Sequence, residues 1–187
     1  MIYFLKMISD DIRVAQVEFR KNSKAKRLTL GSLLACIAAV FQAAGGLLPG
    51  IGYFVSPFAT LPILIGAMFS LQMGMMSYFL TTLLLFILYP SELVIFSFTT
   101  GFLGIGIGAA FSFFKKRFSI IFIGAILLTI GIMSLLYVFH FPVLGPTVSD
   151  SLSFLTVGGI FIFSFLYNWL WVEVALFFFQ KLKTFIT

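Results

Sequence analysis

Six long apolar stretches follow one another along almost the whole chain and limit what it can fold into. A helix needs about 20 mainly apolar residues to cross the core of a lipid bilayer, and the stretches approach or exceed this length. Hydrophobic residues make up 61% of the sequence and charged residues 10%, whereas soluble domains carry about 25% charged residues. Short segments of alternating polarity, typical of membrane β-barrels, are missing from the sequence. We therefore predict an all-α integral membrane protein, a bundle of six transmembrane helices.

Proline, glycine and charged residues separate the expected spans. Pro90 suits the first turn of a helix, and Ser91 and Glu92 suit its start, so a new span is expected there. The predicted spans are Leu28–Leu48, Ser56–Leu71, Gln72–Tyr89, Pro90–Phe114, Phe118–Phe139 and Phe154–Phe179.

The basic residues predict how the bundle is oriented. Seven of the twelve Lys and Arg residues precede position 28, and the others lie at 115–117, 181 and 183. The first, third and fifth connections between spans carry no Lys or Arg. Basic residues collect on the cytoplasmic side of membrane proteins. Six spans with both termini in the cytoplasm place every basic cluster there, and this charge serves topology and contact with anionic lipid rather than nucleic acid.

The first 27 residues form a separate basic segment, and the six-helix membrane domain covers residues 28–187. Acidic residues interrupt the segment and it has no apolar core before a cleavage site, so we do not expect a cleavable signal peptide. One helical face of the segment is apolar: Met1, Leu5, Ile8, Ile12, Ala15 and Phe19. We predict an amphipathic helix in the cytoplasmic membrane interface. The alternative is a partly disordered tail that acts only through its charge.

Aromatic and polar residues gather in the connections on the predicted outer side. A few convergent polar groups among aromatic faces are typical of a small-molecule pocket. The predicted substrate-binding residues are Tyr53, Ser56, Glu92, Thr99, Tyr137, His140, Asp150, Asn168 and Trp169. For any one of them the alternative is an ordinary polar loop or interfacial residue. Glu173, near the inner end of the last span, is either a capped or lysine-paired interfacial carboxylate or a functional group at membrane depth.

The sequence offers no set of residues for catalysis or for a metal. It contains no P-loop pattern for a nucleotide. Cys36 and His140 are the only residues of their types, so a metal cage or a disulfide is not expected. Serine is frequent but lacks a convincing base. We therefore predict neither an enzyme nor a bound cofactor or metal.

The first span carries small residues along one side, in the stretch "LACIAAVFQAAGG" at 34–46. Ala35, Ala39 and Ala43 repeat every four residues and so share one helical face. Small side chains let helix backbones approach closely in lipid. This face therefore contacts another helix, either inside the bundle or in a separate protein. Gly104 and Gly108 predict a second close helix contact, within the bundle.

The chain resembles the substrate-binding (S) components of energy-coupling factor (ECF) vitamin transporters. The resemblance covers about residues 28 to 180. It depends on the size, the six spans, the basic lead into "LTLGSLLACIAAVFQAA" and the passage "LIGAMFSLQMGMMSYFLTTLLL". It implies a protein of the bacterial cytoplasmic membrane that works with a transmembrane coupling subunit and two cytoplasmic ATPases. In that family an A-x-x-x-A signature on the first helix docks the coupling subunit; Ala35 and Ala39 match it, and Ala43 extends it.

The resemblance also implies a mechanism of uptake. A vitamin-sized molecule would enter at the outer mouth, gated by the first connection "LLPGIGYFVS" and by the fifth, and the subunit would then topple to release it inside. Gly50 and Gly52 would give the first connection its mobility. Glu92 and Asp150 lie in the outer connections without a neighbouring Lys or Arg. We therefore expect a neutral or cationic substrate that contains a ring.

Two other classes of function are compatible with a small, apolar, multi-span chain. One is a non-transporting scaffold of cell-wall and cell-shape assembly, of the rod-shape-determining D type. The other is a membrane enzyme, which the sequence disfavours because it shows no adjacent acid and base.

Overall fold

Most of the residues that the structure describes are helical. This computed structural model describes residues 9–141 and 154–186, and contains no strand in those ranges. Six of its helical segments are long and apolar enough to cross a membrane, which confirms the prediction of six such helices in an all-α fold. They are α2 (Lys24–Leu47), α3 to α4 (Gly52–Phe69), α5 (Leu71–Leu88), α6 and α7 (Pro90–Phe98, Thr100–Phe113), α8 with a π-helical extension (Arg117–Met133, Ser134–Val138) and α9 (Phe154–Ile186).

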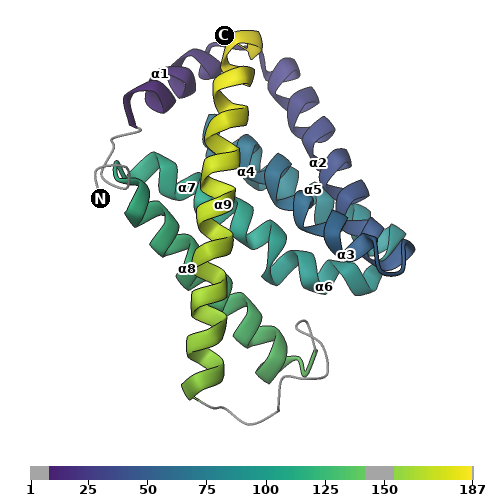
Figure 1. The fold of residues 1–187 in the computed structure, drawn as a ribbon. Coiled ribbons are helices and arrows are strands. Elements are labelled where there is room, and N and C mark those ends of the chain that lie inside the picture. Colours follow the sequence, from purple (N-terminus) through teal and green to yellow (C-terminus); the bar gives the residue numbers. More distant parts are fainter. Residues whose placement is uncertain (1–8, 142–153, 187) are drawn as a thin grey trace.

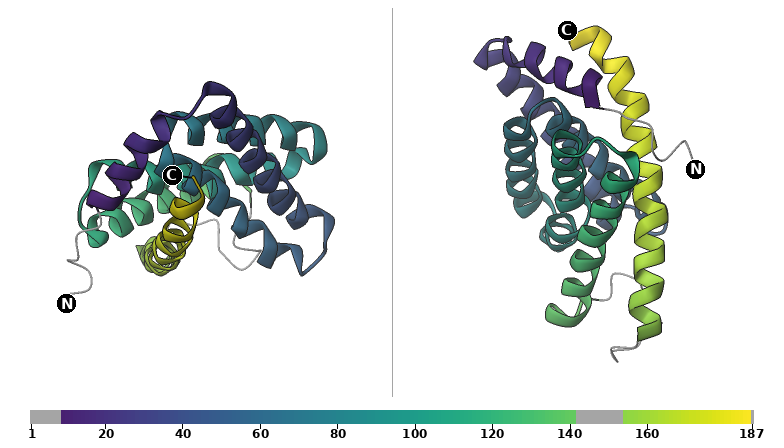
Figure 2. Two further views of the ribbon diagram at one scale, coloured as in Figure 1. Left: turned by 90° about the horizontal axis from the view of Figure 1, so that it is seen from above. Right: turned by 90° about the vertical axis from the view of Figure 1, so that its left-hand side faces the viewer.

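Helix α4 (Thr60–Phe69) forms the centre of the bundle. Every residue from Pro62 to Phe69 is buried, and α4 contacts α2, α5, α7 and α9. Figure 1 shows α4 and α7 in the middle, with α9 crossing in front of them. In Figure 2 the long α9 lies along one side of the bundle and extends beyond it at its N-terminal end. A helix surrounded by other helices has no polar face, which explains why this stretch is apolar all round.

Two glycines of α7 allow its close contact with α4. A Cβ atom at Gly104 would lie 3.0 Å from the Thr60 carbonyl oxygen, and one at Gly108 would meet Ala67 and the Leu64 carbonyl. The helix backbones therefore approach within contact distance, as the Gly104 and Gly108 spacing predicts.

The alanine face of α2 also packs within the bundle. Ala35, Ala39 and Ala43 are 0%, 1% and 4% exposed. The Thr81 hydroxyl of α5 is shared between the Ser77 carbonyl of its own helix, at 2.7 Å, and the Ala35 carbonyl of α2, at 3.2 Å, so these two helices lie close together. The alanine face could contact another helix of the bundle or a separate protein, and the structure shows packing inside the bundle. Other helices of the same chain cover these three alanines, and docking of a separate protein at this face stays a prediction.

The N-terminal helix α1 (Ser9–Arg20) packs its apolar side against the bundle. Ile12, Ala15 and Phe19 are buried to 1% exposure or less, and the rings of Phe19 and Phe69 are 5.6 Å apart. The Gln16 side-chain amide donates to the Met68 carbonyl at 2.8 Å. The predicted apolar face is therefore present in the described part of this segment. This face docks on α4 and α7, and the placement of the helix in the membrane interface stays a prediction.

Two boundaries differ from those predicted. The first connection between spans is shorter than predicted, because helix resumes at Gly52. A Cβ at Gly52 would collide with the Ala44 carbonyl. This glycine is therefore tightly packed and is not the predicted mobile joint. Gly50 alone takes a left-handed conformation there, with φ of 80°. The fourth span is interrupted at Thr99, whose φ and ψ are −117° and −89°. Its hydroxyl donates to the Ile95 carbonyl at 2.6 Å, a side-chain contact that competes with regular helix.

Glu173 has a structural partner. The Arg117 guanidinium at the start of α8 donates to both Glu173 carboxylate oxygens, at 2.9 and 3.2 Å. The pair connects α8 to α9 near the ends that carry the basic clusters. Of the two interpretations of Glu173, the paired carboxylate is the one observed, but its partner is Arg117 and not a lysine.

Candidate functional site

A cavity of about 760 Å³ opens between the helices. This volume lies in the range of pockets that hold small organic molecules and cofactors. The turn after α2, the start of α6, the break between α6 and α7, and parts of α8 and α9 all contribute to its wall. The lining residues are Gly45, Gly46, Pro49, Tyr53, Ser56, Pro57, Tyr89, Ser91, Glu92, Ile95, Thr99, Thr100, Leu103, Leu128, Ile132, Phe141, Phe163 and Tyr167.

A buried carboxylate forms one side of this cavity. Glu92 is 6% exposed, and its Oε2 accepts a hydrogen bond of 2.8 Å from the Gln42 side-chain amide. The Thr100 hydroxyl donates to the other end of that amide, Gln42 Oε1, at 2.6 Å. Three helices thus meet in one polar chain, Thr100 to Gln42 to Glu92. Because Thr100 occupies the Gln42 oxygen, the NH₂ group is directed at the carboxylate.

The local sequence explains why Glu92 lies here. Tyr89 precedes Pro90 and ends α5 with φ and ψ of −156° and 84°, and Pro90 opens α6, so Glu92 falls in the first turn of that helix. A carboxylate is favoured near a helix N-terminus by the helix dipole. A Cβ at Gly45 would lie 2.9 Å from both carboxylate oxygens. The glycine therefore leaves the space that lets the carboxylate approach α2.

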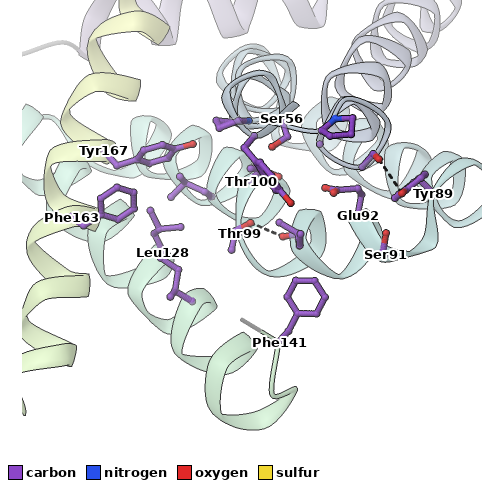
Figure 3. A pocket seen from close by; sticks show the side chains of 18 residues that line it. Ser56, Tyr89, Ser91, Glu92, Thr99, Thr100, Leu128, Phe141, Phe163 and Tyr167 are labelled. Carbon is purple, nitrogen blue, oxygen red and sulfur yellow. Dashed lines mark hydrogen bonds between the residues drawn. The ribbon is translucent and has the colours of Figure 1, made fainter. Parts of the chain in front are cut away.

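The opposite side of the cavity is apolar and aromatic. Figure 3 shows Phe163 and Tyr167 of α9 and Leu128 of α8 on one side, with Glu92, Tyr89 and Ser91 on the other. Thr99 and Thr100 lie between the two sides, at the helix break. The interruption of the fourth span thus brings two hydroxyl-bearing residues to the middle of the cavity wall. A ligand placed here would touch a charged group at one end and rings at the other.

Four of the predicted binding residues line this cavity: Tyr53, Ser56, Glu92 and Thr99. They come from the first connection and from the fourth span. The structure therefore brings these two segments together at one cavity, with the carboxylate between them.

The other predicted residues do not line the cavity. His140 is exposed, with φ of 51°, and Tyr137 is half-buried in the π-helical turn. Asn168 is fully buried, but it lies against Gly124 of α8 and donates to the Ser164 carbonyl at 2.7 Å, so it serves helix packing. Trp169 is 38% exposed and lies outside the cavity lining. Asp150 falls outside the described residues.

Sequence reasoning missed Gln42 as a member of the site. Gln42 is 0% exposed and is an amide inside an otherwise apolar span. A polar side chain at membrane depth is expensive unless it has a partner, so this residue was itself a signal. It lies on the buried side of α2, one position before Ala43, and it could have been paired with Glu92 on that ground. Phe163 and Tyr167 gave no comparable signal, because aromatic residues occur throughout the last span.

The charge of the cavity wall is one-sided. Among the lining residues that the structure describes, Glu92 is the single acidic residue, and none is Lys, Arg or His. In the described ranges no three His, Cys, Asp or Glu side chains group as metal ligands. The arrangement is suited to holding a small organic molecule.

In comparisons with protein-family models, with curated proteins and with solved structures, no match to this chain was found.

Proposed function

We propose that this chain is the substrate-binding subunit of an ECF-type vitamin transporter in the bacterial cytoplasmic membrane. The observation that carries the proposal is the cavity of about 760 Å³ with a buried carboxylate on its wall. A chain that only fills space between partners has no need of a buried charge beside a cavity. A binding subunit does, because the charge orients a ligand.

The distribution of charge supports an outward-facing cavity. The basic clusters lie before and in the first turn of α2, between α7 and the start of α8, and near the C-terminal end of α9. The cavity is lined by residues near the opposite ends of these helices. With the basic ends in the cytoplasm, the cavity faces outward and its ligand arrives from outside the cell.

Transport requires partners, because nothing in the sequence matches a nucleotide-binding P-loop. In the proposal a transmembrane coupling subunit and two cytoplasmic ATPases supply the energy. Since the alanine face is buried, a coupling subunit that contacts α2 has to use its exposed side. Val40, at 67% exposure, lies on that side.

The test of this proposal is co-purification together with uptake, using two neighbouring variants. Val40→Trp places a large ring on the exposed side of α2 and should leave the fold intact while weakening recovery of the coupling subunit. Ala39→Trp forces the same ring into a buried position, and overpacking of that kind costs about 1–3 kcal/mol or more. It should therefore reduce the yield of folded protein rather than act selectively on association.

The proposal fails if the purified wild-type chain brings down no coupling subunit or ATPase and supports no uptake. Recovery of cell-wall assembly proteins instead, without stabilisation by any small molecule, would favour the scaffold of the rod-shape-determining D type.

A further inference from the structure

The Glu92 carboxylate faces the cavity with an incomplete set of hydrogen-bond donors. Gln42 donates to Oε2, and no described residue donates to Oε1. Three of the hydroxyl groups that line the cavity are engaged elsewhere. Thr99 donates to Ile95, Thr100 to Gln42, and Tyr89 to the Gly46 carbonyl at 3.1 Å. The protein itself therefore leaves one carboxylate oxygen for a donor that comes from outside.

That missing donor is best supplied by a positive charge. Burying a carboxylate without a cation costs several kcal/mol, because water no longer solvates it. No Lys, Arg or His belongs to the described lining of the cavity. An N⁺–H donor on a carboxylate is stronger than a neutral hydrogen bond. An anionic ligand would meet a like charge here and find no cationic partner.

The far wall sets the shape of the ligand. Leu128 and Ile132 of α8 and Phe163 and Tyr167 of α9 offer an apolar, partly aromatic surface. Figure 3 shows this surface across the cavity from Glu92. A ligand that fits both sides carries its charge at one end and an apolar or ring-shaped body at the other.

We propose that the cavity binds a small organic cation, an amine protonated at neutral pH whose ammonium group contacts Glu92 and whose ring lies against α8 and α9. The inference rests on the proposed function, since it takes the cavity to be the substrate site. It narrows the substrate class from neutral or cationic molecules to cations.

The test uses two series of probes that share a ring and differ in the end group. One series is phenethylamine, 2-phenylethanol and phenylacetate; the other is tryptamine, tryptophol and indole-3-acetate. Binding at millimolar concentration is measured on the purified full chain in nanodiscs by thermal stabilisation and equilibrium dialysis. We expect the ammonium member of each series to bind more tightly than its hydroxyl and carboxylate counterparts.

The matched variants are Glu92→Gln and Glu18→Gln. In E92Q the new amide keeps an oxygen that accepts from Gln42, so the fold is retained while the charge is removed. A hydrogen bond to a charged group contributes about 1.5–3 kcal/mol, so binding of the amines should weaken about tenfold or more in E92Q. Glu18 is an exposed carboxylate on α1, away from the cavity, and E18Q should bind as the wild type does.

The proposal is overturned if neither amine binds, if the alcohols or carboxylates bind as well as the amines, or if E92Q binds the amines like the wild type. These results differ from a failure of the proposed function. If the amines bind but the chain recovers no ATPase, the cation site is supported and the proposed transporter function is contradicted. If the chain forms an ATPase complex but retains only neutral or anionic molecules, the transporter function is supported and the cation site is contradicted.

Discussion

At the scale of single residues, a buried amide between two polar partners holds the carboxylate side of the cavity together. Gln42 accepts from Thr100 and donates to Glu92, and all three side chains are at most 8% exposed. Removing the amide leaves a hydroxyl and a carboxylate without their partner inside the bundle. The cost of a buried polar group arises mainly when its partner is deleted, not when the bond is formed.

The first prediction concerns this amide. Gln42→Leu has a similar size but neither donates nor accepts, so we expect the free energy of unfolding to fall by about 1–3 kcal/mol. The matched control is Gln180→Leu, because Gln180 is exposed on α9. Denaturant unfolding in mild detergent measures both. Equal stability of the two variants would contradict the role assigned to Gln42.

The same scale shows what could be predicted for the site. Glu92 followed from the proline that starts a helix, because a carboxylate in the first turn has a local electrostatic reason to be there. Asn168 and Trp169 lie outside the cavity lining. Their environment depends on how the last helix is rotated about its axis. That rotation is fixed by packing against α8, as at Gly124 beneath Asn168. No local rule contains this information.

At the scale of elements, small residues allow close helix contacts, but only the tertiary structure shows which helix each small-residue face contacts. Six spans could be predicted from length and hydropathy alone, because the bilayer fixes the length of a span. The partner of each small-residue face could not. The alanine face of α2 and the glycines of α7 carry similar patterns, and the structure buries both against helices of the same chain.

The second prediction compares two glycines. Gly108→Ala adds a methyl group where Ala67 and the Leu64 carbonyl leave no room, so we expect lower stability through overpacking of α4 against α7. Gly158→Ala adds the same group inside α9 with nothing within 4 Å. Alanine is favoured over glycine in a helix by about 1 kcal/mol, so G158A should be neutral or stabilising. Thermal unfolding that ranks the two in the reverse order would refute the α4 and α7 contact.

The third prediction concerns the docking of α1. Phe19 is fully buried between α1 and the bundle, and loss of a buried Phe costs about 3–5 kcal/mol. Phe19→Ala should therefore release α1, seen as faster amide hydrogen exchange across residues 12–20. Val17→Ala on the exposed side of the same helix, 59% exposed, should leave exchange unchanged. Equal hydrogen exchange in the two variants would contradict the docking of α1 on the bundle.

At the scale of the whole molecule, ligand capture depends on which side of the membrane each end faces. Both termini and the loop at Lys115 are predicted to lie inside, and the mouth of the cavity outside. The break at Thr99, the short turn after α2 and the start of α6 then gather on the outer side. Binding from outside is possible only in this orientation.

The fourth prediction tests that orientation by labelling cysteines in whole cells. In a Cys36→Ser background, Ser91→Cys lies exposed at the cavity and should react with a membrane-impermeant maleimide added outside. Lys181→Cys, exposed near the end of α9, should react only after the membrane is permeabilised. Reversed labelling would place the cavity on the cytoplasmic side.

Native mass spectrometry of the purified chain tests the central claim, that the cavity holds a small molecule, most directly. We expect the wild type to retain a molecule of vitamin-like mass. Ser56→Trp, which adds a ring on the cavity wall, should lose it, whereas Val40→Trp on the outer side of α2 should keep it. Retention that is identical in all three proteins, or no retained molecule in the wild type, would contradict the account.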